Sequence, residues 1–423
     1  MSNYKLGLDF AKEQDQNDPL AAYKKLFHIP KDTHGNELIY MTGNSLGLQP
    51  KATKNYINQE LDDWANLGVE GHTEAKHPWL PYHEFLTENM AKVVGAKPIE
   101  VVVMNTLTAN LHLMMVSFYR PTQKRYKIVI EADAFPSDKY AVESQLRHHG
   151  FDANEGLILW KARKGEELAN YNDLQTILET QGKDIALVMI GGVNYYTGQF
   201  FDLKRITQLG HKHGCMVGFD CAHGAGNVEL NLHDSGADFA VWCTYKYLNS
   251  GPGSLGGCFV HERHAHNKNL NRFAGWWSHN KETRFKMRNE FDQLPGAEGW
   301  QLSNPPILSM AAIRASLDIF AEVGMKKLTE KSRQLTGYFE FLLNELNNKD
   351  IKIITPSNPN ERGCQLSIQV KNADKTLHTK LTKAGVISDW REPDVIRCAP
   401  VPLYNSFQDV YNLVEKLKSI LND

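Results

Sequence analysis

Two charged residues stand at the ends of consecutive apolar runs near the middle of this chain. Asp220 closes the run MVGFD, and Lys246 follows the run FAVWCT by two residues. Pyridoxal 5′-phosphate requires an amine that bonds its aldehyde and an acid that keeps its ring nitrogen protonated, so that the ring can withdraw electrons. Asp220 and Lys246 therefore predict a pyridoxal 5′-phosphate site. His223 strengthens this prediction, because it and Asp220 can approach one ring.

Each of these residues also has an ordinary structural interpretation. A lysine after a strand is usually a solvated surface charge, and a buried aspartate is usually part of a salt bridge or a helix cap. A protonated pyridine nitrogen would compensate Asp220, and that ion pair would raise the pKa of the nitrogen. Asp220 and Lys246 together favour the cofactor site over the separate structural roles.

A phosphate group needs its own binding site, and the first strand-to-helix turn offers one. The run VVVMN continues into TLTANLHLMMVSFY, whose apolar residues have helical spacing. Thr106, Thr108 and the free backbone N–H groups of a helix N-terminus suit a dianion through hydrogen bonds and the helix dipole. The alternative is an ordinary threonine cap without a ligand.

A third element of the predicted site is the segment EADAFPSDKY, which follows the run YKIVI. Phe135 offers a flat face on which a pyridine ring could stack. Asp138 is a second carboxylate that could lie near the cofactor. The alternative is that Pro136, Ser137 and Asp138 form only a turn and a helix cap.

Arg397 lies inside the short apolar run VIRCAPV. A buried arginine needs a partner, and a carboxylate suits its planar guanidinium group in bidentate fashion. That partner is the α-carboxylate if the substrate is an amino acid, or a carboxylate of the protein itself.

The histidine-rich segment HERHAH does not predict a metal centre. His261 and His264 could share one helical face, but the segment lacks the H-E-x-x-H spacing and a third ligand at a fixed distance. We interpret it as a surface helix and expect no metal site.

The order of apolar and amphipathic segments indicates how these residues are positioned. Apolar runs alternate with helical patterns between residues 100 and 260, and such strands form a largely parallel sheet covered by helices on both faces. Ligands of such sheets bind at the carboxyl ends of the strands. The predicted strands are EVVVMN, YKIVIEA, DIALVMIGGV, CMVGFD, FAVWCT and GGCFVHE.

A second region begins after SNPPI, at residues 303–307. One long helical pattern at 308–347 precedes short strands and a last helix, for which Ser406 and Asp409 form a capping box. We predict a large cofactor-binding domain at 61–305 and a small α+β domain at 306–423. Residues 1–60 are expected to contribute to the small domain and to an interface.

Composition excludes several classes of function. The 423 residues include 47 Lys and Arg against 49 Asp and Glu, for a net charge of −2, so neither nucleic acid nor an anionic membrane surface is expected as a partner. We find no signal peptide, no apolar stretch long enough to span a membrane and no C-x-x-C pair among the six cysteines. These features predict a cytoplasmic protein with reduced thiols.

Taken together, the motifs resemble the kynureninase family, whose members are fold-type-I pyridoxal phosphate enzymes. The resemblance extends over nearly the whole chain and includes TGNSLGLQPK, NTLTANLHLM, AFPSDKYAVESQ, GFDCAHGAGNVELNLHDSGADFA, YKYLNSGPG, SNPPIL, ERGCQL and APVPLYNSFQDVY. It implies hydrolysis of kynurenine or 3-hydroxykynurenine to anthranilate or 3-hydroxyanthranilate and alanine. It also implies a homodimer that builds each active site from both subunits.

The resemblance assigns residues one by one. Lys246 would bond the cofactor and act as catalytic base, with Tyr245 as our candidate for a second proton-transfer group. The other cofactor-binding positions would be Leu107, Thr108, Phe135, Pro136, Ser137, Asp138, Asp220, His223, Tyr245, Trp276 and Asn304. The substrate-binding positions would be Arg397, His72, Ser45 and Asn304, of which His72 and Asn304 favour the 3-hydroxy substrate.

The chain departs from the family pattern at His77, Gly191 and Cys221, where arginine, serine and leucine are more usual. Two other interpretations remain open at this point. One is a cysteine desulfurase or class V aminotransferase of the same fold, for which Cys364 would be the best candidate for a reactive thiol. The other is a scaffold protein that keeps the fold without catalysis.

Overall fold

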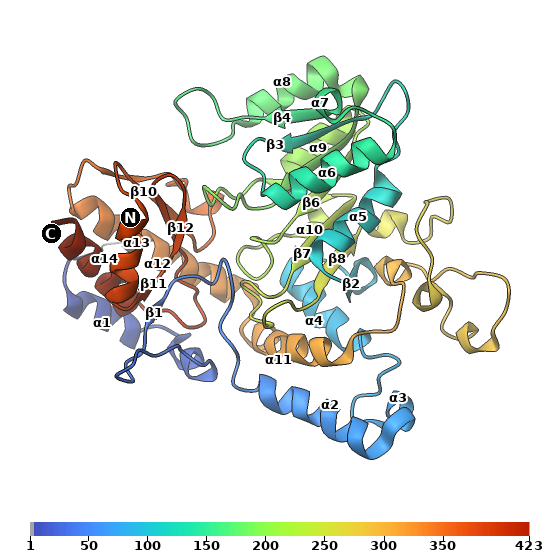
Figure 1. Ribbon diagram of the computed structural model, residues 1–423, viewed down its shortest axis with the longest axis horizontal. Coiled ribbons are helices and arrows are strands. Elements are labelled where there is room, and N and C mark those ends of the chain that lie inside the picture. Colours follow the sequence, from blue (N-terminus) through green and yellow to red (C-terminus); the bar gives the residue numbers. More distant parts are fainter. Residues whose placement is uncertain (1–3, 423) are drawn as a thin grey trace.

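A computed structural model describes residues 4–422 and shows a seven-stranded mixed sheet at the centre of the molecule (Figure 1). The strand order is β2-β8-β7-β6-β5-β3-β4, and β8 runs antiparallel to both of its neighbours. The strands are β2 (Val101–Met104), β3 (Lys127–Glu131), β4 (Leu157–Trp160), β5 (Ile185–Gly191), β6 (Met216–Asp220), β7 (Phe239–Cys243) and β8 (Gly256–Val260). All six predicted strands are confirmed, and β4 is an additional one.

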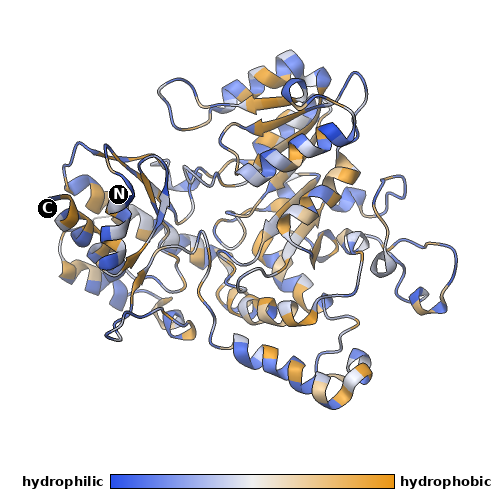
Figure 2. Cartoon of the chain, in the orientation of Figure 1, coloured by the Kyte–Doolittle hydropathy of each residue, from blue (hydrophilic) through white to orange (hydrophobic). Residues whose placement is uncertain are grey.

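Successive side chains along these strands point to opposite faces of the sheet, and they form two core layers. Val129, Val188 and Phe219 pack on one face of the sheet, whereas Ile128, Leu187 and Phe239 pack on the other. Figure 2 shows the apolar strands enclosed by helices that are apolar on one side and polar on the other. The covering helices include α5 (Leu107–Phe118), α6 (Pro136–His148), α7 (Ala153–Gly156), α8 (Tyr171–Gln181), α9 (Leu203–Lys212) and α10 (Leu232–Ser235).

The long helical pattern near residue 308 forms two helices instead of the one that we expected. Helix α11 (Ile307–Val323) and helix α12 (Met325–Glu345) meet at Gly324, whose φ of 78° lies in the left-handed region and ends the first helix. Helices α2 (Thr53–Leu67) and α4 (Glu84–Val94) pack against α11, and the short α3 (Gly71–Glu74) follows α2.

The chain after α12 forms a small antiparallel sheet with the order β12-β13-β10-β9. The predicted capping box of the last helix is confirmed, since the Ser406 N–H donates to Asp409 and the Asp409 N–H donates to Ser406, each at 3.0 Å. The elements are β9 (Ile351–Ile353), β10 (Leu366–Val370), α13 (Lys375–Lys383), β11 (Val386–Ile387), β12 (Asp389–Arg391), β13 (Val395–Cys398) and α14 (Phe407–Asn422).

The N-terminal segment lies against this C-terminal region (Figure 1). Helix α1 (Leu8–Gln16) packs on α14, and strand β1 (Ile39–Tyr40) pairs with β11. The domain boundaries at residues 60 and 305 stay a prediction. No helix among residues 4–422 is long and apolar enough to cross a membrane.

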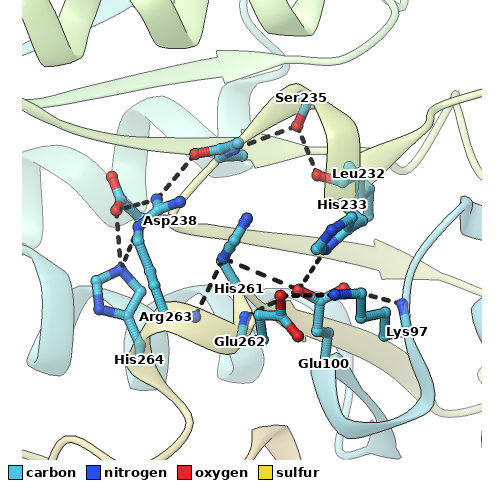
Figure 3. Close-up of polar contacts among 12 residues, drawn as sticks. Lys97, Glu100, Leu232, His233, Ser235, Asp238, His261, Glu262, Arg263 and His264 are labelled. Atoms are coloured by element: carbon cyan, nitrogen blue, oxygen red, sulfur yellow. Dashed lines mark hydrogen bonds and ion pairs between the residues drawn. The ribbon is translucent and has the colours of Figure 1, made fainter.

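Two buried carboxylates tie together the ends of the sheet strands remote from Lys246 (Figure 3). Glu100 accepts the N–H groups of Lys97 and Glu262 and lies 2.9 Å from Nδ1 of His233. Asp238 interacts with His211, Arg263 and His264, which we call the Asp238 cluster.

The HERHAH segment is therefore not a surface helix, and that interpretation was wrong. Only Glu262–His264 forms a short 3₁₀ turn. His261 faces Glu100 and His264 faces Asp238, so the two histidines have different partners.

Candidate functional site

A cavity of about 190 Å³ opens at the carboxyl ends of β3, β5, β6 and β7. Its walls include nine of the predicted site residues, namely Leu107, Thr108, Phe135, Ser137, Asp138, Asp220, His223, Tyr245 and Lys246. Parallel strands place these side chains together because residues just past each strand end share one edge of the sheet. Pro136 starts helix α6 beside this cavity without lining it.

Lys246 and His223 are in direct contact. The Lys246 Nζ atom lies 3.0 Å from Nε2 of His223 and 5.8 Å from the centre of the Phe135 ring. Burial, together with the Lys246 charge, holds the pKa of His223 well below its usual value. The other ring nitrogen, Nδ1, is buried without a partner among the described residues. The imidazole of His223 is therefore neutral beside the Lys246 side chain.

Asp220 and Asp138 are neighbouring carboxyl groups that both line the cavity. Asp220 accepts the N–H of Ala222 at 2.7 Å and shares a hydrogen bond with the carboxyl group of Asp138. Burial raises the pKa of both groups, and the charge of Asp220 raises that of Asp138 further. Because a carboxyl-to-carboxylate hydrogen bond contains one proton, the pair carries one negative charge.

Two helix N-termini meet at the cavity. Thr108 and Ser137 are the second residues of α5 and α6, and their hydroxyl oxygens lie 3.0 Å apart. Free N–H groups and two helix dipoles directed at one place favour an anion. The geometry suits a phosphate group held between the two helices.

Arg397 is occupied by a carboxylate of the protein itself. Its Nε and Nη2 atoms bind Asp389 at 3.0 and 2.8 Å, and its Nη1 donates to the Tyr195 carbonyl at 2.6 Å. Tyr195 lines the cavity, so Arg397 lies directly behind the cavity wall. Of the two partners considered from the sequence, the intraprotein carboxylate is the one observed.

Besides Pro136 and Arg397, four further predicted residues do not line the cavity of the single chain. Ser45 is exposed, although nearby Gly47 donates its N–H to the Tyr245 carbonyl at 2.8 Å. His72 packs edge-on against Trp79, and Asn304 is exposed ahead of α11. Trp276 is 42% exposed and lines a separate hollow.

Sequence reasoning missed five residues of the cavity wall: Glu131, Gly191, Val193, Tyr195 and Ala222. Glu131 is the most informative, because it is the last residue of β3 and is fully buried. An acidic residue at the end of an apolar strand beside Asp220 was a signal of the same kind as Asp220 itself. Tyr195 stands edge-on to Phe135, with ring centres 5.3 Å apart.

Cys364 does not behave as a reactive thiol. It is 1% exposed, and burial raises its pKa to about 12. A nucleophilic cysteine is accessible and has a lowered pKa, so this side chain does not suit the desulfurase interpretation.

The sequence matches a family model described as the kynureninase C-terminal domain over residues 328–417. The chain is 58% identical to a kynureninase from Myxococcus xanthus, with 97% of this chain and 96% of that protein covered. It is 55% identical to a kynureninase from Koribacter versatilis and 48% identical to one from Nematostella vectensis, covering 98% and 93% of those proteins and 98% and 97% of this chain.

Solved structures of similar fold include two cysteine desulfurases. One from Escherichia coli aligns with a TM-score of 0.76 over 95% of this chain and 98% of its own, and one from Thermococcus onnurineus with 0.74 over all of both chains. Each is 16% identical to this chain, so these likenesses establish the fold alone and confirm the predicted fold-type-I architecture.

Proposed function

The chain belongs to the kynureninase family, and from that premise we propose that it hydrolyses the Cβ–Cγ bond of L-kynurenine or 3-hydroxy-L-kynurenine. The products are anthranilate or 3-hydroxyanthranilate and L-alanine, in tryptophan catabolism or NAD biosynthesis. The observation that carries the proposal is the cavity that unites Lys246, His223 and Asp220 in a chain 58% identical to a kynureninase.

The cavity fits pyridoxal 5′-phosphate, which when bound supplies an electron-withdrawing ring to the reacting carbons of the substrate. Asp220 would hold the ring nitrogen, and Nδ1 of His223 is a buried polar atom without a partner among the described residues. Phe135 would cover one ring face. Thr108 and Ser137 at the helix N-termini, with Leu107 and Tyr245, would hold the phosphate.

Lys246 would act twice in the reaction. Its amine would hold the cofactor through the aldehyde group, and the same amine would remove the proton from the substrate Cα. Nε2 of His223, whose pKa is held low by burial, lies 3.0 Å from Nζ of Lys246 and would keep the amine in place.

Tyr245 would move a proton when water adds to the aryl ketone of the substrate. Burial raises the pKa of its phenol well above the usual value, so the group is a neutral proton donor at neutral pH. Replacement of Tyr245 by phenylalanine should lower kcat at least tenfold. Full turnover by that variant would remove Tyr245 from the mechanism.

Arg397 would bind the substrate α-carboxylate beside the cavity wall. Asp389 already binds the guanidinium group of Arg397. The substrate carboxylate would therefore either replace Asp389 or share Arg397 with it. Arg397→Lys keeps the charge but loses the bidentate geometry, so KM should rise severely. An unchanged KM would exclude Arg397 from substrate binding.

We further propose a cytoplasmic homodimer in which the second subunit completes the site. Trp276, Asn304 and His72 lie away from the cavity of their own chain, and aromatic side chains near Trp276, such as Phe273 and Phe285, are exposed. Exposed apolar groups of this kind are typical of an interface. Sedimentation should give twice the monomer mass of 48.0 kDa.

The decisive experiment combines labelling with kinetics. Borohydride treatment of the holoenzyme should attach the cofactor to the peptide that contains Lys246, and Lys246→Ala should abolish both the label and turnover. Product fluorescence on the two kynurenines should show cleavage of one or both, with the 3-hydroxy compound preferred. A wild-type enzyme that cleaves neither, or that carries no label, contradicts the proposed function.

A further inference from the structure

Glu131 has a position in the site that no role proposed above uses. It lines the cavity, is fully buried, and both of its carboxyl oxygens accept the Gly191 N–H at 3.1 Å. Gly191 is paired with Asp220 in the β5–β6 register. Glu131 therefore holds the strand end adjacent to the one that presents Asp220.

Gly191 makes this arrangement possible because it has no side chain. A Cβ atom at residue 191 would lie 2.6 Å from Oε1 of Glu131, which is closer than carbon and oxygen can approach. The Glu131 carboxyl group thus fills the space that the side chain of residue 191 would occupy. A side chain at residue 191 would therefore have to displace that carboxyl group.

The balance of charges around the cavity determines whether Glu131 is protonated. Glu131, Asp138 and Asp220, which we call the carboxyl cluster, surround the cavity with Lys246 as the cation among its lining residues. His223 is neutral, and the Asp138–Asp220 pair shares one proton and carries one negative charge. Lys246 balances that charge, so an ionised Glu131 would be a second buried anion without a compensating cation among the lining residues, which is strongly unfavourable.

The other groups around Glu131 do not change this balance. Asp133 is exposed, and Tyr245 is a neutral phenol. Burial, with a smaller contribution from the charge of Asp220, raises the pKa of Glu131 to about 7. The hydrogen bonds from Gly191 oppose this rise but do not cancel it. This direction agrees with the charge count.

We propose that Glu131 is a positioning residue of the cofactor site, a neutral carboxylic acid that fixes the end of β5 beside Asp220 without adding charge there. Asp220 and its partner Asp138 then present a single negative charge to the cofactor ring nitrogen. This inference rests on the proposed function for the identity of the cofactor. The protonation of Glu131 can be measured independently of the catalytic activity.

The first test compares a neutral isostere with a truncation. Glutamine at position 131 keeps an acceptor for the Gly191 N–H and carries no charge, so Glu131→Gln should keep cofactor affinity at pH 6 within about threefold of wild type. Glu131→Ala leaves that buried N–H unpaired and should weaken cofactor binding about tenfold or more. Asp133→Asn is the matched control, an exposed acid two residues away whose replacement should leave affinity unchanged.

The second test observes the proton itself. Infrared spectra of the wild-type holoenzyme at pH 6 should contain the C=O band of a protonated, buried carboxyl group that is absent in Glu131→Gln and retained in Asp133→Asn. A missing band, a Gln variant as damaging as Ala, or an Ala variant that binds the cofactor normally would each overturn the inference. Loss of the borohydride label at Lys246 in wild type would instead contradict the proposed function.

Discussion

The sheet carries buried acids at both of its ends, and the two sets are in opposite electrostatic situations. At the carboxyl ends of the strands, the carboxyl cluster has acids facing acids, and burial raises their pKa values. At the other end, burial opposes the ionisation of Asp238, but hydrogen bonds from His211 and His264 and the charge of Arg263 outweigh it and hold its pKa well below the usual range.

The difference separates acids that stabilise the fold from acids that serve a ligand. Asp238 has every partner it needs within the chain, including the Val217 N–H at 2.7 Å, and it ties α9 to the turn after β8. The carboxyl cluster accepts the N–H groups of Gly191 and Ala222 but has Lys246 as the cation among the lining residues, so its repulsion is relieved by protons, by Lys246 and by a cationic ligand. Unrelieved acids in a cavity therefore mark the functional end of the sheet.

The largest expected effect follows from replacement of Asp220 by asparagine. Asparagine keeps an acceptor for the Ala222 N–H but removes the charge that faces the ring nitrogen, so kcat should fall about 100- to 1000-fold. Steady-state kinetics at saturating cofactor measures this. The cofactor-free variant should unfold at no lower denaturant concentration than wild type, and a kcat within tenfold of wild type would contradict the role.

Asp238→Asn should show the reverse pattern. Removal of the charge leaves His264 and Arg263 without their anion, and unfolding free energy should fall by about 3 kcal/mol because a buried charge network is broken. The kcat of the folded holoenzyme should stay within twofold of wild type, since the Asp238 cluster does not touch the cavity. Urea unfolding gives the first quantity, and unchanged stability would remove the distinction between the two ends.

The pH dependence of stability should have opposite signs at the two ends. Glu131 has a folded-state pKa raised from 4.5 to about 7, so the folded chain binds its proton more tightly and stability is lost as pH rises from about 4.5 to 7. Glu131→Gln removes this loss and should stabilise the cofactor-free protein by about 2–3 kcal/mol at pH 8, with no difference near pH 4.

Asp238 has a depressed pKa, so its contribution is present above about pH 4, the unfolded value, and is lost as pH falls below it. The deficit of Asp238→Asn relative to wild type should therefore shrink on acidification. Urea midpoints of the cofactor-free wild type and both variants, measured from about pH 2 to 8, test both signs. Parallel curves for Glu131→Gln and wild type would contradict a protonated Glu131.

Much of the cofactor-binding end could be predicted from sequence because strand ends are visible as the last polar residue of an apolar run. Asp220 and Lys246 were found in this way, and the six predicted strands are present. Glu131 met the same criterion but has no motif that marks it. The role of Glu131 depends on its hydrogen bond with Gly191, which is 60 residues away in sequence and is brought close by the sheet.

Partners distant in sequence limited the other predictions. Arg397 was recognised as needing a carboxylate, but a short strand does not reveal that Asp389 pairs with it across the β12–β13 ladder. The HERHAH segment was misread as a surface helix because its partners, Glu100 and Asp238, come from other elements. Gly324 divides α11 from α12, although the hydrophobic pattern continues through it.

The smallest expected effect concerns a single partner of Asp238. His211 is 37% exposed and is one of three cationic or hydrogen-bonding side chains on that carboxylate, so His211→Ala should cost about 0.5–1 kcal/mol of unfolding free energy. His264 is 12% exposed and makes the equivalent contact, which makes His264→Ala the matched comparison with a larger expected loss. A loss for His211→Ala as large as that for Asp238→Asn would mean that the carboxylate depends on one partner rather than on a network, and the contrast with the carboxyl cluster would then rest on a single contact.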